Sequence, residues 1–108
     1  MVAKIPKQRH DKHPDPLHEI RNYLKYDRVF ETGHALQRLQ QREVTHFEYK
    51  YVLSHGQREK SRDRYDEKFE EWTYSMKGKT LENRTLRVIV SFNIKLNVIT
   101  VIDLDLEL

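Results

Sequence analysis

Apolar positions recur at helical spacing in the first part of the chain. Asp15 and Pro16 are residue types favoured at an N-cap and at the first helical position. Apolar residues follow them at helical intervals and form one stripe, consisting of Leu17, Ile20 and Leu24. The pattern predicts a helix that ends near Tyr26 and needs a surface to pack on.

Two more helices are expected before the period changes. The segment HALQRLQQRE follows Thr32 and Gly33, and its straight-chain residues favour a helix whose buried side carries Ala35, Leu36 and Leu39. Thr45 and Glu48 then have the spacing of a capping box, which predicts a third helix over HFEYKYVLSH. We expect Gly56 to end this helix in the left-handed conformation.

Beyond Gly56 the pattern is typical of strands. The segment REKSRDRYDEKFEE is too charged for the core and predicts an edge strand with a long polar loop. Alternating residues then predict three strands near 72–77, 86–92 and 98–105. Helices followed by an antiparallel meander indicate an α+β fold, with the N-terminal helices on one face of a small antiparallel sheet.

The C-terminal run alternates up to its last residue. Its apolar side chains are Ile102, Leu104, Leu106 and Leu108, and its acidic ones are Asp103, Asp105 and Glu107. Since no turn closes the run, we expect a strand with a free edge. We expect the N-terminal helix to cover the apolar face, and the edge to serve a homodimer or a partner protein that adds a strand.

Composition limits the classes of protein. With 108 residues, 37% of them hydrophobic, we expect an N-terminal leader and accessory helix over 1–28 and a single α+β domain over 29–108. Three glycines without a GxGxxG or GxxxxGK[ST] motif exclude Rossmann and P-loop enzymes. The absence of Cys excludes a thiolate nucleophile and Cys-ligated zinc. No long apolar run occurs, so we expect a cytoplasmic protein without a membrane partner.

Charge permits a polyanionic partner. Lys and Arg number 20 against 17 Asp and Glu, and the last six residues hold three of the acids, so the body of the chain is basic. This balance suits RNA binding, and it also describes an ordinary well-solvated surface.

The second predicted helix carries the strongest candidate chemistry. His34, Arg38 and Arg42 are four residues apart and span only about 80° of the helix surface, at the rim of its buried side. A His can exchange a proton near neutral pH, and guanidinium groups bind phosphate in a bidentate manner. Metal-free RNA cleavage needs these groups, although an ordinary basic helix face has the same spacing.

Three segments give a resemblance to a known family. They are GHALQRLQQREVTHFEYKYVLSHG, DRYDEKFEEWTYSMKGKTLENRTLRVIVSF and NVITVIDL, and together they resemble the domain of unknown function 4258 family over residues 33–104. The positions that match the family pattern are His34, Ala35, Arg38, Arg42 and Thr100, whereas Glu43 replaces a frequent Gly.

The resemblance also implies a function. In plan the family is similar to small ribonucleases and toxins such as barnase, the colicin-type tRNA nucleases and the RelE-like mRNA interferases. In those proteins, helices cover one face of an antiparallel sheet, and RNA is cut on the other face without a metal. The resemblance therefore implies a toxin-like ribonuclease with RNA as its substrate and a neutralising antitoxin as its partner.

Other candidate residues lie on the predicted strands. Arg87 is on the face opposite the apolar side chains of its strand, where it can meet a phosphate. Thr100 shares a face with Ile102, and it is buried if that face belongs to the core. Tyr74 alternates onto the side of the core, where it is either a core aromatic or a base-stacking platform.

Two hypotheses remain. In the first, the chain is a metal-independent ribonuclease, and the alternative is a non-catalytic interaction module on the same scaffold. The candidate catalytic residues are His34, Arg38, Arg42, Arg87 and Thr100. The candidate RNA contacts are Tyr74, Lys77 and Arg84. We expect no cofactor and no metal, since the His10, His13 and His18 cluster lies in a Pro-containing segment with no fixed element to set ligand geometry.

Overall fold

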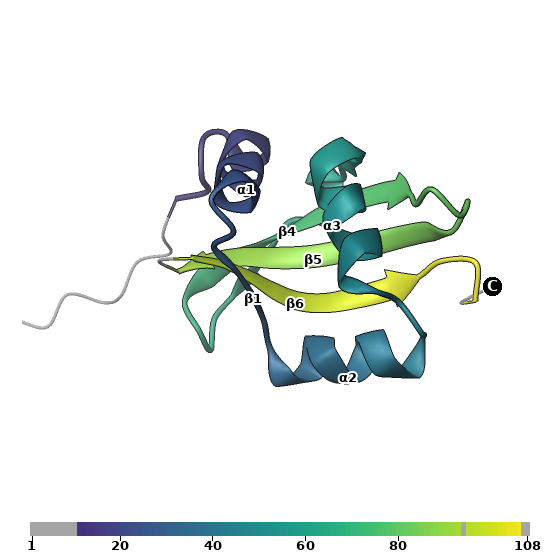
Figure 1. Ribbon diagram of the computed structural model, residues 1–108. Helices are drawn as coiled ribbons and strands as arrows, with labels where there is room; N and C mark the ends of the chain where they lie inside the picture. Colours follow the sequence, from purple (N-terminus) through teal and green to yellow (C-terminus); the bar gives the residue numbers. More distant parts are fainter. Residues whose placement is uncertain (1–10, 94, 107–108) are drawn as a thin grey trace, which may run out of the picture.

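A computed structural model describes residues 11–93 and 95–106 (Figure 1). Its helical elements are α1 (Pro16–Lys25), α2 (Gly33–Gln41), α3 (His46–His55) and the short 3-10 helix η1 (Lys60–Arg62). Its strands are β1 (Val29–Glu31), β2 (Gln57–Arg58), β3 (Arg64–Asp66), β4 (Glu71–Lys79), β5 (Thr85–Asn93) and β6 (Lys95–Asp103).

The three predicted helices are confirmed, together with their N-caps. The side chains of Asp15 and Thr32 each accept a hydrogen bond from a backbone N–H of the first turn, at 3.1 Å in both cases. Thr45 and Glu48 form the predicted capping box at the start of α3. These bonds satisfy N–H groups that the helix cannot pair internally.

Gly56 ends α3, but the left-handed conformation expected for it is wrong. Its backbone is extended, with φ −78° and ψ −172°. A Cβ atom at this position would lie 2.5 Å from the carbonyl oxygen of Val52 and 2.6 Å from that of Lys77. Glycine is therefore needed because the end of α3 approaches β4 closely, and not because of its φ angle.

The strands form one mixed sheet in the order β1-β6-β5-β4-β2. β3 also pairs with β4 but lies outside this order. Every pair is antiparallel except β1–β6, which is parallel. The predicted α+β class is confirmed, and the three long predicted strands correspond to β4, β5 and β6. The prediction of a wholly antiparallel sheet is wrong because β1, which the sequence pattern did not indicate, joins β6 in parallel.

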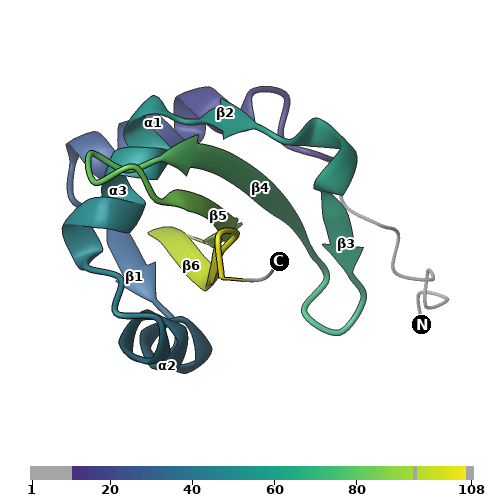
Figure 2. The same cartoon turned by 90° about the vertical axis from the view of Figure 1, so that its right-hand side faces the viewer.

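Helices cover one face of the sheet. Figure 1 shows α1 and α3 over this face, whereas Figure 2 shows α2 apart from them, beside the β1 and β6 side of the sheet. The expected layer of three helices therefore contains two, and α2 packs mainly along β6. The core between sheet and helices includes Ile20, Ala35, Leu39, Val44, Tyr49, Val52, Leu53, Tyr74, Met76, Leu86, Val88, Val90, Leu96, Val98 and Val101.

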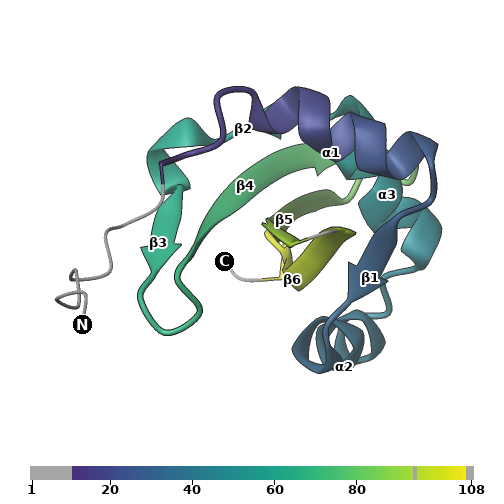
Figure 3. The same ribbon diagram turned by 90° about the vertical axis from the view of Figure 1, so that its left-hand side faces the viewer.

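No described helix covers the opposite side of the sheet, named here the open face. The β3–β4 hairpin curls away from the helices beside this face, as Figures 2 and 3 show. The open face is therefore bordered by α2 on one side and by the hairpin on the other.

A β-bulge in β6 decides which residues reach each face. Ile89 pairs with Thr100 but Val90 pairs with Val98, so Ile99 is an extra residue in the ladder. Beyond the bulge, Val101 and Asp103 are buried on the helix-covered face. Thr100 and Ile102 consequently lie on the open face, so the expectation that Ile102 begins a buried apolar face, with the acids outside, is wrong.

The C-terminal run is not an open strand. β6 ends at Asp103, and residues 104–106 form a turn in which the N–H of Leu106 donates to the carbonyl of Asp103, whereas residues 107–108 lie outside the described residues. The other side of β6 is covered, first by β1 and then by α2. The free edge inferred from the sequence is therefore wrong. α1 does contact β6, as expected, but together with α3 on the helix-covered face.

Part of the N-terminal leader lies against the domain. The N–H of His13 donates to the Tyr74 hydroxyl at 2.8 Å, and Lys12 Nζ lies 3.0 Å from Asp63. Residues 1–10, including His10, lie outside the described residues. Of the helices in the described part of the chain, none has the length and apolarity that a membrane crossing requires.

Candidate functional site

His34 and Arg38 lie side by side on the surface of α2. The Nε of Arg38 donates to Nε2 of His34 at 3.4 Å, and its Nη1 donates to Oε1 of Gln41 at 3.0 Å. The Thr32 cap fixes the start of this helix, and burial of Ala35 fixes its rotation. The structure thus brings together two of the three residues of the predicted polar ridge.

Arg42, the third residue of the ridge, is turned towards β6. Its Nη1 donates to the carbonyl of Val101 at 3.4 Å, where β6 has passed the end of β1. The guanidinium of Arg42 therefore takes part in holding α2 to the sheet. This contact distinguishes it from the His34 and Arg38 pair.

A groove of about 420 Å³ lies on the open face, between the start of α2 and the β3–β4 hairpin. Its lining residues come from α2 and its cap, from the hairpin and from the central strands, and they are Thr32, His34, Phe69, Glu71, Ser91, Asn97 and Ile99. His34 thus stands at the boundary between the helix and the groove, which is a position from which an imidazole can act on a bound molecule.

A second polar cluster lies on the open face around Arg87. Its Nε and Nη2 donate to the two carboxylate oxygens of Glu59 at 2.6 and 2.8 Å, and the Ser75 hydroxyl donates to Glu59 at 2.7 Å. The bonds from Arg87 lower the pKa of Glu59 to about 2, and those from Glu59 raise the pKa of Arg87. Lys77 is exposed and pairs directly with Arg87 across the two strands.

Glu59 could not be recognised as a site residue from the sequence because it lies in a segment rich in both charges. Strand pairing places Arg87 next to Ile102 on β6, and α2 lies beyond β6. Arg87 is therefore separated from the His34 and Arg38 pair by a strand. Thr100 is half-buried on the same strand, opposite Ile89, and lies between the two clusters.

Tyr74 belongs to the core. The side chain is only 3% exposed, its ring packs 5.2 Å from that of Phe92, and its hydroxyl accepts the bond from His13. Burial raises the pKa of Tyr74. A ring in this position offers no face to a base, so the structure removes Tyr74 from the candidate RNA contacts.

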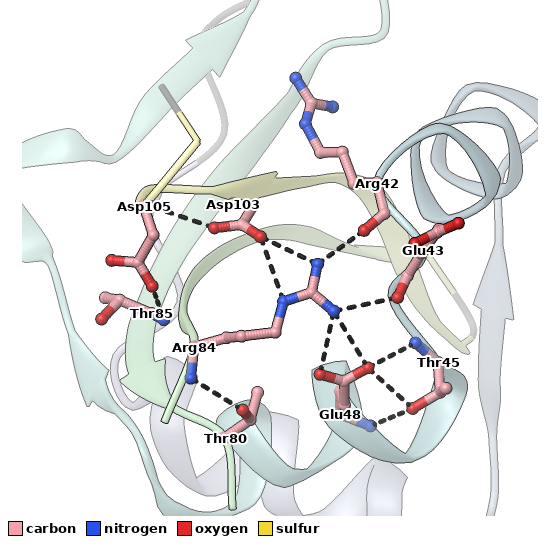
Figure 4. Close-up of polar contacts among 9 residues, drawn as sticks. All are labelled: Arg42, Glu43, Thr45, Glu48, Thr80, Arg84, Thr85, Asp103 and Asp105. Atoms are coloured by element: carbon pink, nitrogen blue, oxygen red, sulfur yellow. Dashed lines mark hydrogen bonds and ion pairs between the residues drawn. The ribbon is translucent and has the colours of Figure 1, made fainter. Parts of the chain in front are cut away.

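Arg84 occupies a network that joins four parts of the fold (Figure 4). Its Nε and Nη2 donate to Asp103 at the end of β6, and Nη2 also donates to the carbonyl of Arg42 at 2.6 Å. Its Nη1 donates to the carbonyl of Glu43 at 2.9 Å and to the carboxylate of Glu48. All three guanidinium nitrogens have protein acceptors, so the structure gives Arg84 a structural position in place of the predicted RNA contact.

The described residues offer no metal centre. Within residues 11–93 and 95–106, no group of three or more His, Asp or Glu side chains is arranged to hold a metal ion. The groups present on the open face are imidazole, guanidinium, ammonium, hydroxyl, amide and carboxylate groups.

Comparison with known proteins identifies a family. No curated protein and no solved structure matches the chain significantly. A family model matches residues 32–103, which include α2, α3 and all of the strands except β1. The chain belongs to the family described as domain of unknown function (DUF4258).

Proposed function

We propose that the chain is a toxin-like, metal-independent ribonuclease that works on the open face of its sheet. The observation that carries the proposal is the contact between His34 and Arg38 at the border of the groove. An imidazole and a guanidinium at this separation can act together on one phosphodiester. Lys77 adds positive charge along the same face, whereas the charge of Arg87 is balanced by Glu59.

In the proposed reaction the 2′-oxygen of the RNA attacks the neighbouring phosphorus, and the bond from phosphorus to the 5′-oxygen breaks. His34 takes the proton from the 2′-hydroxyl or gives one to the leaving 5′-oxygen, and water exchanges the other proton. Arg38 holds the phosphate and stabilises the added negative charge of the transition state. The products end in a 2′,3′-cyclic phosphate and a 5′-hydroxyl.

The experiment is a cleavage assay on labelled single-stranded RNA in the presence of EDTA. We expect the purified protein to form cyclic-phosphate ends, Arg38→Ala to lower the rate about 100-fold or more, and His34→Ala to lower it similarly. Absence of cleavage, with equally weak growth inhibition by wild type and Arg38→Ala, contradicts the ribonuclease. Full activity of His34→Ala contradicts only the role of His34.

The alternative is a non-catalytic interaction module on the same scaffold. It is supported by the structural contacts of Arg42 and Arg84 and by the ion pair of Arg87, which leave fewer basic groups for catalysis. This alternative predicts RNA or protein binding that survives Arg38→Ala without any cleavage.

The proposal carries expectations about the cellular setting. A toxin-like ribonuclease acts on RNA in the cytoplasm and needs a neutralising antitoxin, so we expect a partner protein whose binding blocks the groove. The sequence also suggested a homodimer that forms through the C-terminal strand. Light scattering on the purified protein tests for this homodimer.

A further inference from the structure

The groove beside His34 combines features that suit an unpaired nucleobase. Its volume of about 420 Å³ is in the range of small-ligand sites. Ile99 provides an apolar part of the lining, and polar groups from α2 and its cap, β4, β5 and β6 surround it. The proposed function needs a place for the base next to the cleaved phosphate, and the inference made here rests on that function.

Ser91 gives the first sign of a ligand. This residue is fully buried, lines the groove, and its Oγ has no hydrogen-bond partner among the described residues. Buried hydroxyl groups are nearly always paired in folded proteins. Ser91 pairs directly with Asn97 across the strands, so an amide and an unpaired hydroxyl lie together in the groove.

Asn97 has unused hydrogen-bonding capacity. The bond from its Nδ2 to the carbonyl of Lys95 is 3.5 Å long, at the limit of such bonds. An amide side chain carries two donor hydrogens and one acceptor oxygen, and it can therefore pair with a base edge in more than one way.

Phe69 supplies an aromatic surface on the opposite wall. It lies between β3 and β4, and 65% of its surface is exposed. The Lys68 ammonium lies 5.3 Å from the centre of this ring and adds positive charge beside it. Single-stranded RNA is commonly bound by stacking an unpaired base on such an aromatic ring.

Glu71 gives the groove a preference among bases. Its carboxylate only accepts hydrogen bonds, and two adjacent donors satisfy both of its oxygens. Guanine presents two adjacent donors, N1–H and the N2 amine, on its Watson–Crick edge, whereas the corresponding edges of adenine, cytosine and uracil each pair a donor with an acceptor. We propose that this groove binds an unpaired guanine of the substrate RNA, stacked on Phe69 and paired with Glu71, so that cleavage occurs at the adjoining phosphate.

The test is nucleotide binding, which does not depend on cleavage. Guanosine 3′-monophosphate is titrated into the full chain and compared with the adenosine, cytidine and uridine monophosphates, by calorimetry and by amide chemical shifts. We expect the guanosine nucleotide to bind at least 10-fold more tightly than the others and to shift the signals of Ser91, Asn97 and Ile99. Inosine monophosphate, which lacks the N2 amine, should bind with intermediate affinity.

Two variants separate stacking from base selection. Phe69→Ala should weaken all four nucleotides by about 5-fold to 100-fold, the range given by base stacking on an aromatic ring. Phe47→Ala is the matched control, because Phe47 is 62% exposed but lies on α3. Glu71→Gln should remove the preference for guanosine over inosine, with little effect on the other nucleotides. Melting temperatures show whether each variant is folded.

The outcomes distinguish the two proposals. Guanosine binding with these variant effects supports the base site, even if the protein cleaves no RNA. Cleavage of RNA by the wild type, together with equal binding of all four nucleotides or unchanged binding by Phe69→Ala, overturns the base site and leaves the ribonuclease standing. Absence of nucleotide binding at millimolar concentration also overturns the base site.

Discussion

Arg84 donates two hydrogen bonds to one carboxylate oxygen of Asp103, from Nε at 3.1 Å and from Nη2 at 2.9 Å. The Asp103 side chain is 3% exposed and lies on the helix-covered face of the sheet. Because the same guanidinium also holds the carboxylate of Glu48 and the backbone between α2 and α3, it ties the helix that carries His34 to the end of β6. The candidate site thus depends on a buried ion pair that lies outside it.

Arg84→Met is expected to lower the free energy of unfolding by about 3–5 kcal/mol, because it leaves two buried carboxylates without their cation. Urea unfolding at neutral pH measures the loss. Arg38→Met, on the surface of α2, is the control and should change stability by less than about 1 kcal/mol. Adding Asp103→Leu to Arg84→Met should recover part of the loss, and equal losses from Arg84→Met and Arg38→Met contradict the structural role of Arg84.

The ion pair of Glu59 with Arg87 should make stability depend on pH in the acid range. The folded pKa of Glu59 is about 2 against an ordinary value of 4.5, so the unfolded chain binds more protons between these values. The contribution, at most about 3 kcal/mol, is complete above pH 4.5 and is lost as pH falls towards 2. Urea unfolding between these pH values should show that the free energy of unfolding falls less with decreasing pH for Glu59→Gln than for the wild type.

Two arginine variants test which cation causes the Glu59 effect. Arg87→Met should remove the acid dependence as Glu59→Gln does, because the bonds from Arg87 are its main cause. Arg62→Ala should retain most of it, since Arg62 Nε lies 3.5 Å from Glu59 and its side chain is half exposed. The same pH profile in all three variants counts against this assignment.

The sequence was informative where local chemistry decides the structure. The caps at Asp15, Thr32 and Thr45 were found because side chain and backbone pair within a few residues. Alternation located β4, β5 and β6 because each is nine residues long. β1 was missed because three residues are too few for a period.

Contacts between distant residues could not be read from local pattern. Arg84 meets Asp103 and Glu48 only after the sheet and α3 have packed, and the extra residue Ile99 leaves no mark in the alternation of apolar and polar positions. Of the candidate site, the neighbouring positions His34 and Arg38 followed from helical spacing. The groove did not, because its residues come from separate elements.

Lys77 should contribute to RNA binding through charge alone, because it is exposed on the open face beside Arg87. Lys77→Ala is expected to weaken binding of single-stranded RNA regardless of sequence, and to reduce the slope of log affinity against log salt by about 0.7. Fluorescence anisotropy at several salt concentrations measures both. Lys25→Ala removes the same charge from α1 on the other face and should leave the slope unchanged.

Two glycines should respond oppositely to alanine. Gly56→Ala places a Cβ within 2.6 Å of two backbone oxygens, so the end of α3 has to move away from β4, at a cost of about 1–3 kcal/mol. Gly33 is the first residue of α2, and a Cβ atom added there meets no atom within 4 Å. Gly33→Ala should therefore stabilise the protein by about 0.4–1 kcal/mol. Thermal unfolding checks both, and a stabilising Gly56→Ala would show that the close approach is not constraining.

The bulge at Ile99 determines which side chains in the second half of β6 point to each face of the sheet. If the same residues paired in a regular ladder without the bulge, Ile102 would turn into the core and Asp103 would turn out to solvent. Arg84 would then lose its carboxylate, and Thr100 would leave the open face. The bulge therefore couples the buried ion pair to the side chains of the open face, because regular pairing of the same residues would disturb both faces at once. Deleting Ile99, the extra residue, would instead leave a regular ladder in which Thr100 and Asp103 keep their present partners and faces.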